Sequence, residues 1–210
     1  MKKILVVDDH AVVRRGLQQI ISDSLDAVVV NEAKNGSEAL AFARKGQYDL
    51  VLLDISLPDR TGIDVLKDLK AFQPDLPVLM LSIHPEEQYA IRALRAGASG
   101  YLTKASPPEE LITAISKVLS GEKYITATFA QQLISNLDKE NAVLPHQNLS
   151  DREYQVMCLL AQGRTPKQIG SDLKVSIKTV STYRSRILEK LKIHSNAEIT
   201  RYCLEHQLID

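Results

Sequence analysis

Residues 1–120 alternate five times between a short apolar run and a longer segment with helical periodicity. The apolar runs lie near residues 4–7, 27–31, 50–53, 78–81 and 99–102, and the amphipathic segments near 11–22, 36–45, 61–72, 86–96 and 107–120. A short apolar run that is bounded by polar residues and followed by a helical pattern indicates a buried parallel strand. Five such repeats predict an α/β fold, a (βα)5 doubly wound parallel sheet, over residues 1–121.

Acidic residues close two of these apolar runs. Asp8 and Asp9 follow the run Ile4–Val7, and Asp54 follows the run Leu50–Leu53. Because ligands of open α/β sheets bind at the carboxyl ends of the strands, we expect the three carboxylates to meet there. Such carboxylates repel one another unless a cation lies between them, and oxygen ligands suit Mg²⁺. The pattern therefore predicts a Mg²⁺ site that can also accept a phosphoryl group.

The pattern changes after residue 121. Residues 122–148 have weaker periodicity, with one helix predicted near 126–137, and we interpret this segment as a linker. Residues 149–210 contain no strand-like run, and their periodicity predicts a small all-α domain with helices near 151–162, 166–173, 177–191 and 196–206.

The formal net charge of zero is unevenly distributed along the chain. Residues 1–122 contain 14 Lys and Arg against 17 Asp and Glu, a net charge of −3, whereas residues 149–210 contain 10 against 7, a net charge of +3. A basic C-terminal part is a mild indication of nucleic-acid binding.

The overall composition is that of an ordinary globular protein. It is 44% hydrophobic and 25% charged, and no apolar run approaches the length of about 18 residues that a membrane span needs. The N-terminus lacks the pattern of a secretory signal, so we expect a cytoplasmic protein with no membrane association. Cys158 and Cys203 lack metal-ligand spacing, and we expect both to be reduced thiols in the core.

Four separated motifs in residues 1–121 resemble the receiver domain of response regulators. They are VVDDH (6–10), LLDISLPDRTG (52–62), LMLSIH (79–84) and GYLTKAS (100–106). The resemblance implies that Asp54 accepts a phosphoryl group and that Asp8 and Asp9 bind Mg²⁺ beside it. It also implies that the backbone carbonyl of Ser56 is a further Mg²⁺ ligand. A single Asp after an apolar run is more often a capping residue, so the four motifs in order carry this interpretation.

The same resemblance assigns roles at two further strands. Ser82 would donate a hydrogen bond to the phosphoryl group, Lys104 would form an ion pair with it, and Tyr101 would change orientation on activation. A carboxylate can accept a phosphoryl group only if cations offset the incoming charge, and Lys104 with Mg²⁺ can supply them. Taken singly, a serine, a lysine or a tyrosine at these places is more often a loop, surface or packing residue. The resemblance also suggests a cis peptide bond between Lys104 and Ala105.

Residues 149–209 resemble the LuxR-type, also called NarL-type, helix-turn-helix domain. The matching sequence is LSDREYQVMCLLAQGRTPKQIGSDLKVSIKTVSTYRSRILEKL, followed by AEITRYCLEHQLI. Ser150 with Glu153 predicts a capping box, and Thr165 and Ser176 predict the starts of the next two helices. Two residues depart from the family: Lys174 stands where Gly is usual in the turn, and Gly170 where a small Ala is usual.

The predicted helix over residues 177–191 would be the DNA recognition helix. Its periodicity places Val180, Ile187, Leu188 and Leu191 in a buried stripe, with a small polar face opposite. That face suits base edges in a major groove, while nearby cations can reach phosphates. The candidate DNA contacts are Lys178, Thr179, Ser181, Thr182, Arg184, Ser185, Arg186 and Lys190.

Together these features predict a two-domain transcriptional response regulator rather than a free-standing enzyme. A sensor histidine kinase would phosphorylate Asp54, and the C-terminal domain would bind double-stranded DNA as a homodimer. One alternative is a receiver that acts mainly through protein contacts, with the helical domain as a docking module. A phosphorylation-independent regulator is another alternative, against which the intact acidic set argues.

Overall fold

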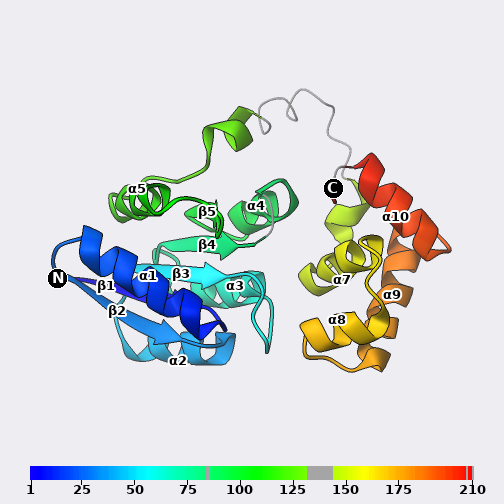
Figure 1. Cartoon of the computed structure of the whole chain (residues 1–210), viewed down its shortest axis with the longest axis horizontal. Helices are drawn as coiled ribbons and strands as arrows, with labels where there is room; N and C mark the ends of the chain where they lie inside the picture. Colours follow the sequence, from blue (N-terminus) through cyan, green and yellow to red (C-terminus); the bar gives the residue numbers. More distant parts are fainter. Residues whose placement is uncertain (84–85, 132–143, 207, 210) are drawn as a thin grey trace. The chain divides into compact units, whose positions relative to one another are not determined.

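The computed structural model describes residues 1–83, 86–131, 144–206 and 208–209 of the chain (Figure 1). It divides into two compact units, Met1–Ser135 and Asn136–Asp210. Within the described residues, no helix is both long enough and apolar enough to cross a membrane.

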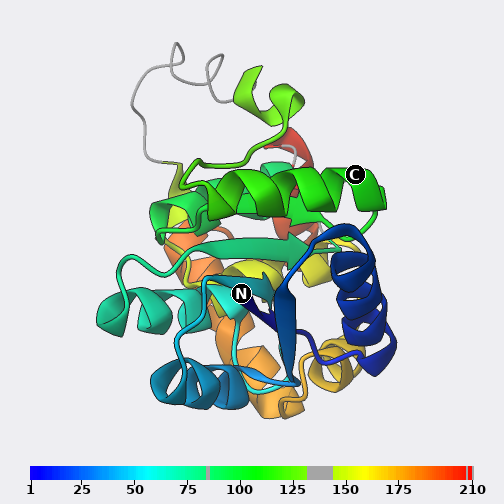
Figure 2. The same ribbon diagram turned by 90° about the vertical axis from the view of Figure 1, so that its left-hand side faces the viewer.

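The first unit confirms the predicted α/β fold. Its strands are all parallel and lie in the order β2-β1-β3-β4-β5. Helix α1 contacts α5 on one face of the sheet, and α3 contacts both α2 and α4 on the other (Figures 1 and 2). The strands are β1 (Lys2–Val7), β2 (Val28–Ala33), β3 (Leu50–Asp54), β4 (Val78–Ser82) and β5 (Gly100–Thr103). The helices are α1 (Ala11–Ser24), α2 (Gly36–Lys45), α3 (Gly62–Phe72), α4 (Glu86–Arg95) and α5 (Pro108–Leu119).

The boundaries of the second strand differ from the prediction. Ala27 was expected in the strand, but its φ of 53° is left-handed and its carbonyl accepts a hydrogen bond from the N–H of Lys2. The strand therefore starts at Val28, and it continues to Ala33, two residues beyond the predicted end. A second difference concerns the Lys104–Ala105 peptide bond, which is trans rather than cis.

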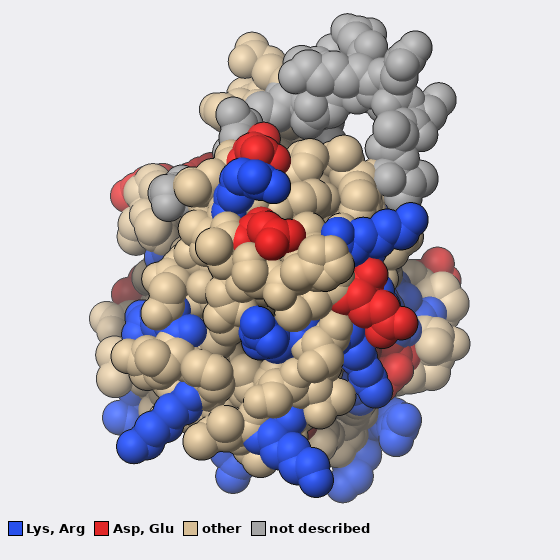
Figure 3. Space-filling model, turned by 90° about the vertical axis from the view of Figure 1, so that its right-hand side faces the viewer, with Lys and Arg blue, Asp and Glu red and all other residues tan. Residues whose placement is uncertain are grey.

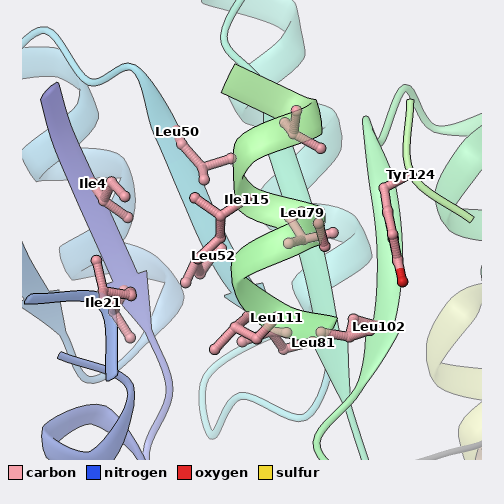
Figure 4. Packing of buried hydrophobic residues seen from close by; sticks show 13 residues of the cluster. Ile4, Ile21, Leu50, Leu52, Leu79, Leu81, Leu102, Leu111, Ile115 and Tyr124 are labelled. Atoms are coloured by element: carbon pink, nitrogen blue, oxygen red, sulfur yellow. The ribbon is translucent and has the colours of Figure 1, made fainter. Parts of the chain in front are cut away.

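The core of the first unit lies between the sheet and the helices α1 and α5 (Figure 4). Every second residue of a strand points to this face, as the pleat requires. Ile115 of α5 packs among these strand residues, and Ile21 of α1 is also fully buried. The strand residues of this cluster are Ile4, Val6, Leu50, Leu52, Leu79, Leu81 and Leu102.

The first part of the segment expected to be a linker packs on the first unit. Tyr124 forms a parallel bridge with Gly100, and its N–H donates to the carbonyl of Ser99 at 2.9 Å. The Tyr124 hydroxyl donates to Glu110 at 2.8 Å. Of the helix expected near 126–137, residues 127–131 are helical, and residues 132–143 lie outside the described part of the chain.

The described residues of the second unit include the four predicted α-helices, each within one residue of its expected boundaries. They are α7 (Asp151–Ala161), α8 (Pro166–Asp172), α9 (Ile177–Leu191) and α10 (Asn196–Glu205). A short 3-10 helix, η1 (Pro145–Asn148), precedes them and was not expected. Its His146 is buried and lies 3.1 Å from the Tyr202 hydroxyl of α10, so the end of the expected linker packs on the second unit. Cys158 and Cys203 are both buried free thiols, and burial raises the pKa of Cys203 to about 12.

Both departures from the family pattern lie at the turn between α8 and α9, where the structure explains Gly170 but not Lys174. Lys174 has a φ of 53°, which is the left-handed conformation that usually favours glycine. Gly170 lies close to the same turn, since a Cβ added there would stand 2.9 Å from the carbonyl oxygen of Val175. The Val175 N–H in turn donates to the Gly170 carbonyl at 2.9 Å. Gly170 thus permits a close approach of the turn to α8.

Helix α7 begins at a reciprocal capping box, and Glu153 of this box also forms an ion pair with α9. Ser150 accepts from the N–H of Glu153, and the Glu153 carboxylate accepts from the N–H of Ser150 at 2.8 Å. The same carboxylate lies 2.6 Å from the ammonium group of Lys190, and its side chain is 3% exposed. Burial by itself raises the pKa of Glu153, but the hydrogen bonds from Lys190 and Ser150 outweigh burial and hold that pKa below its usual value.

We expect Gly62→Ala to destabilise the first unit severely. An added Cβ would lie 2.0 Å from the carbonyl oxygen of Asp54, and this atom cannot move without disrupting β3. The predicted loss in unfolding free energy is more than about 2 kcal/mol, measured by urea denaturation with NMR signals of this unit. Gly16→Ala is the matched control: its Cβ would meet nothing within 4 Å, so it should stabilise α1 by about 0.5–1 kcal/mol. Equal stabilities of the two variants would contradict the close approach.

The lowered pKa of Glu153 predicts an acid-dependent loss of stability. A group whose folded pKa is depressed stabilises the protein above its unfolded pKa, about 4.3, and this contribution disappears as the pH falls through the folded pKa. Glu153→Gln should therefore cost about 1–2 kcal/mol at pH 7, and the difference from the wild type should shrink below about pH 4. Urea denaturation followed by NMR signals of the second unit measures this difference. Glu198→Gln, at the less buried capping position of α10, should have a smaller effect. A pH-independent difference for Glu153→Gln would refute the assignment.

Candidate functional site

The carboxyl ends of β1 and β3 bring three acidic side chains together. Asp8 and Asp54 are 1% and 2% exposed, and the side chain of Asp9 is 20% exposed. The strand register pairs Val7 with Leu53, which places the two acidic ends side by side. One ligand atom from each of Asp8, Asp9, His10 and Asp54 lies within 4.8 Å of the others. The expected meeting of the three carboxylates is therefore observed.

Lys104, from the loop after β5, enters this acidic cluster. Its ammonium nitrogen lies 2.6 Å from a carboxylate oxygen of Asp8 and 2.8 Å from one of Asp54. Burial on its own lowers the pKa of Lys104, but Asp54 and Asp8 more than offset this, so the pKa is raised and the lysine stays charged. The Lys104 backbone N–H donates to the carbonyl of Ser82 at 2.7 Å, so the loop also contacts the end of β4.

The negative charge of the cluster exceeds what one ammonium group balances. Burial raises the pKa of Asp54, the Asp8 charge raises it further, and Lys104 lowers it only in part. A raised carboxylate pKa means that the ionised form lacks sufficient positive charge around it. Carboxylate oxygens in a buried cluster with excess negative charge are suitable ligands for a hard divalent cation such as Mg²⁺.

His10 is a member of this cluster that the sequence-based prediction missed. Its Nδ1 lies 2.8 Å from Asp9 and 3.2 Å from Asp8, and its backbone N–H donates to the Asp8 carboxylate at 2.8 Å. The imidazole is 67% exposed, so it lies at the entrance of the cluster. The signal that could have found it is its place directly after the acidic pair in the motif VVDDH.

The other predicted residues of this site lie on the neighbouring elements. Ser82 is fully buried at the end of β4, and Tyr101 is fully buried in β5. The backbone N–H of Ser56 donates a hydrogen bond to the Asp54 carboxylate. The cluster is thus surrounded by the ends of β1, β3 and β4 and the loops that follow β3 and β5.

In the second unit, α9 presents the small polar face that the sequence predicted. Val180, Ile187 and Leu191 are buried, whereas Leu188 is only partly buried. Ser181, Thr182 and Ser185 are exposed, and each hydroxyl donates to the backbone carbonyl four residues earlier at 3.0–3.1 Å. Because these hydroxyl protons are donated within the helix, the exposed hydroxyl oxygens remain available as hydrogen-bond acceptors.

The candidate cations of α9 have different surroundings. Lys178 and Arg186 are exposed, whereas Arg184 is partly buried and donates to the Asn196 side chain of α10 at 2.6 Å. Lys190 forms the ion pair with Glu153 of α7. Thr179 is partly buried, and its hydroxyl lies 2.8 Å from that of Ser176 at the helix cap.

Exposed basic side chains also extend beyond α9. Lys167 of α8 and Lys174 in the following turn are exposed, as is Lys178 in the first turn of α9. Figure 3 shows Lys and Arg side chains over the lower part of this face of the molecule, where α8 and the start of α9 lie in Figure 1. This unit therefore combines a small polar helix face with a basic border.

Two family models match the chain, one for each unit. The model of the response regulator receiver domain matches residues 4–116. The model of the luxR family of bacterial regulatory proteins matches residues 147–203. The first of these models alone covers more than half of the chain.

Response regulators match this chain over nearly its whole length. Response regulator UvrY of Escherichia coli K12 is 36% identical over 209 residues, which cover 99% of this chain and 96% of UvrY. Response regulator GacA of Pseudomonas aeruginosa is 36% identical over 211 residues, covering 100% of this chain and 99% of GacA. Among solved structures, the response regulator ChrA of a heme-sensing two-component system is 31% identical with a TM-score of 0.52, covering 99% and 98% of the two chains.

These matches agree with the buried acidic cluster of the first unit and the basic, polar helix face of the second. The chain belongs to the response regulator family, as a phosphorylation-dependent, DNA-binding transcription regulator in which a receiver domain precedes a luxR-type domain.

Proposed function

We propose that Asp54 is the phosphoryl acceptor and that a sensor histidine kinase is the donor. The observation that carries this proposal is the buried contact of Asp54 with Lys104, beside Asp8 and Asp9, at the ends of two adjacent strands. An Asp54 oxygen would attack the phosphorus of a phosphohistidine in line, the P–N bond would break, and the histidine nitrogen would keep the electron pair and take a proton. Asp54 would then carry an acyl phosphate.

Asp8, Asp9, Asp54 and the backbone carbonyl of Ser56 would hold Mg²⁺, which when bound supplies the positive charge that the cluster lacks. Lys104 contributes the second positive charge, because its ammonium group already lies against Asp54. This chemistry, with the later hydrolysis of the acyl phosphate, is signalling rather than the turnover of a metabolite.

The switch would follow from the new charge on Asp54. A phosphoryl group adds nearly two negative charges and strong acceptor oxygens, so it would draw the Lys104 ammonium and the Ser82 hydroxyl toward it. Both residues are buried or nearly so, and the Lys104 N–H is already bonded to the Ser82 carbonyl. A movement of the loop that carries Lys104 would therefore reach the end of β4, and the buried Tyr101 ring would change orientation as β5 adjusts.

In the second unit we propose that α9 enters a major groove of double-stranded DNA. Lys178 and Arg186 are exposed and would contact phosphates. Ser181, Thr182 and Ser185, with Thr179 at the helix start, would approach base edges. The exposed hydroxyl oxygens of Ser181, Thr182 and Ser185 can accept hydrogen bonds from the amino groups that adenine and cytosine present in this groove. For Arg184 and Lys190 the internal partners Asn196 and Glu153 favour a role in holding α9 in place.

We further propose that residues 122–148 link a (βα)5 receiver domain of residues 1–121 to a DNA-binding domain of residues 149–210, with Tyr124 of the linker anchored on the first domain and His146 on the second. Phosphorylation would favour a homodimer, since two copies of a helix-turn-helix domain read two half-sites of a duplex. The protein would act in the bacterial cytoplasm, the compartment that contains the DNA.

The acceptor assignment predicts a phosphorylation that depends on one residue. Incubation with a small phosphodonor and Mg²⁺ should add one phosphoryl group to the wild type and none to Asp54→Asn, as measured by intact mass. Chelation of Mg²⁺ should stop the reaction, as should Asp9→Ala.

Asp59→Asn is the matched control for this experiment. Asp59 lies in the loop after β3, but its carboxylate accepts from the N–H groups of Gly36 and Ser37 and is not part of the acidic cluster. This variant should be phosphorylated like the wild type. Phosphate uptake by Asp54→Asn at the wild-type rate would show that the acceptor is another residue.

The placement of α9 predicts two kinds of DNA-binding defect. Lys178→Ala or Arg186→Ala should weaken binding to every duplex and lower the salt slope of log K by about 1, because each lost phosphate contact releases roughly one counterion fewer. Ser181→Ala, Thr182→Ala or Ser185→Ala should instead change base preference with a nearly constant slope. Titration of a selected and a scrambled duplex at several salt concentrations measures both effects.

Lys45→Ala, an exposed lysine at the end of α2 in the other unit, is the control for loss of charge and should leave the salt slope unchanged. If the three hydroxyl variants together kept the wild-type base preference, α9 would not be the reading helix.

A further inference from the structure

Helix α9 leaves one large apolar side chain in solvent at the place where it begins. Ile177, its first residue, is 53% exposed, whereas Val180 and Ile187 of the buried stripe are fully buried. Among the described residues of the second unit, Leu204 of α10 is the other large apolar side chain with a comparable exposure, 52%. A single exposed apolar residue is ordinary in a soluble protein, so the position of Ile177 decides its meaning.

Ile177 borders the polar face of α9. The Ser181 hydroxyl, one turn further along, donates to the Ile177 carbonyl at 3.0 Å, and residues four apart lie on the same side of a helix. The next residue, Lys178, is exposed and basic. The exposed half of Ile177 is therefore continuous with the surface that we propose faces DNA.

The position of Ile177 is also well fixed. The Ser176 side chain caps α9 by accepting from the N–H of Thr179 at 3.0 Å. The backbone at Ile177 lies close to α8, where a Cβ on Gly170 would come within 3.8 Å of the Ile177 nitrogen. A β-branched side chain on this fixed first turn has few rotamers available, so it presents a defined apolar surface.

The chemistry of the major groove offers one kind of apolar partner. The first residues of a recognition helix lie nearest the base edges, and the C5 methyl group of thymine is the apolar group that base pairs present there. We propose that Ile177 contacts the C5 methyl group of a thymine and thereby makes this chain prefer thymine at one position of each half-site. The inference rests on the proposed role of α9 and adds to it an apolar contact beside the polar ones.

Replacement of thymine by deoxyuridine tests this proposal, because it removes the methyl group and keeps every hydrogen-bonding group of the base. The probe is the duplex that the phosphorylated full-length chain selects from a random pool, with each thymine replaced singly. At one thymine per half-site the wild type should lose affinity by about fourfold, the effect expected for one buried methyl group. Ile177→Ala should bind the thymine duplex more weakly and show no preference between the two bases there. Ile177→Val, which keeps a β-branched side chain, should retain most of the preference.

Leu204→Ala is the matched control, since it removes an equally exposed apolar side chain from α10 and should keep the wild-type preference. The proposal is overturned if no deoxyuridine replacement weakens wild-type binding, a result that does not depend on the folding of any variant. It is also overturned if Ile177→Ala keeps the wild-type sensitivity to the methyl group. In both cases salt-dependent binding to the selected duplex would still support the proposed function, whereas the absence of such binding to any duplex would refute that function as well.

Discussion

A buried excess of negative charge at the ends of β1 and β3 governs the chemistry of the acidic cluster in the first unit. Asp8 and Asp54 are nearly inaccessible to water, and the ammonium group of Lys104 balances only part of their charge. Because this balance is incomplete, the cluster is suited to the cation and the phosphoryl group that we propose it binds. The backbone hydrogen bond from Lys104 to Ser82 connects the loop after β5 to the end of β4, beside this charge.

The sequence predicted the parts of this arrangement that follow from strand order and side-chain alternation. Apolar runs located the strands, and the rule that ligand sites lie at strand ends located Asp8, Asp9 and Asp54. The position of His10 depends on the turn after β1, where its backbone N–H donates a hydrogen bond to the Asp8 carboxylate. Hydrophobic periodicity carries no information about the conformation of that turn. The start of β2 was misplaced for a similar reason, since Ala27 has a left-handed conformation that its residue type does not favour.

In the second unit the helix boundaries were predictable because capping residues are local signals. The partners of Lys190 and Arg184 were not, because they join residues 37 and 12 positions apart through the packing of three helices. A helical wheel assigns both cations to the solvent side, and only the tertiary contacts show that each is engaged within the protein. The glycine at position 170 could not be explained from the sequence either. The reason for it is the Val175 carbonyl oxygen, which would lie 2.9 Å from a Cβ at that position.

The pairing of Tyr124 with Gly100 has a consequence for how the receiver can be isolated. β5 is the last strand on its side of the sheet, and an uncovered strand edge is a template for pairing with other chains. The residues after α5 occupy part of that edge through the backbone of Tyr124, and the Tyr124 hydroxyl fastens them to α5. A fragment cut at residue 121 would lose this cover and gain a tendency to aggregate, so the self-sufficient folding unit extends past the end of the (βα)5 repeat.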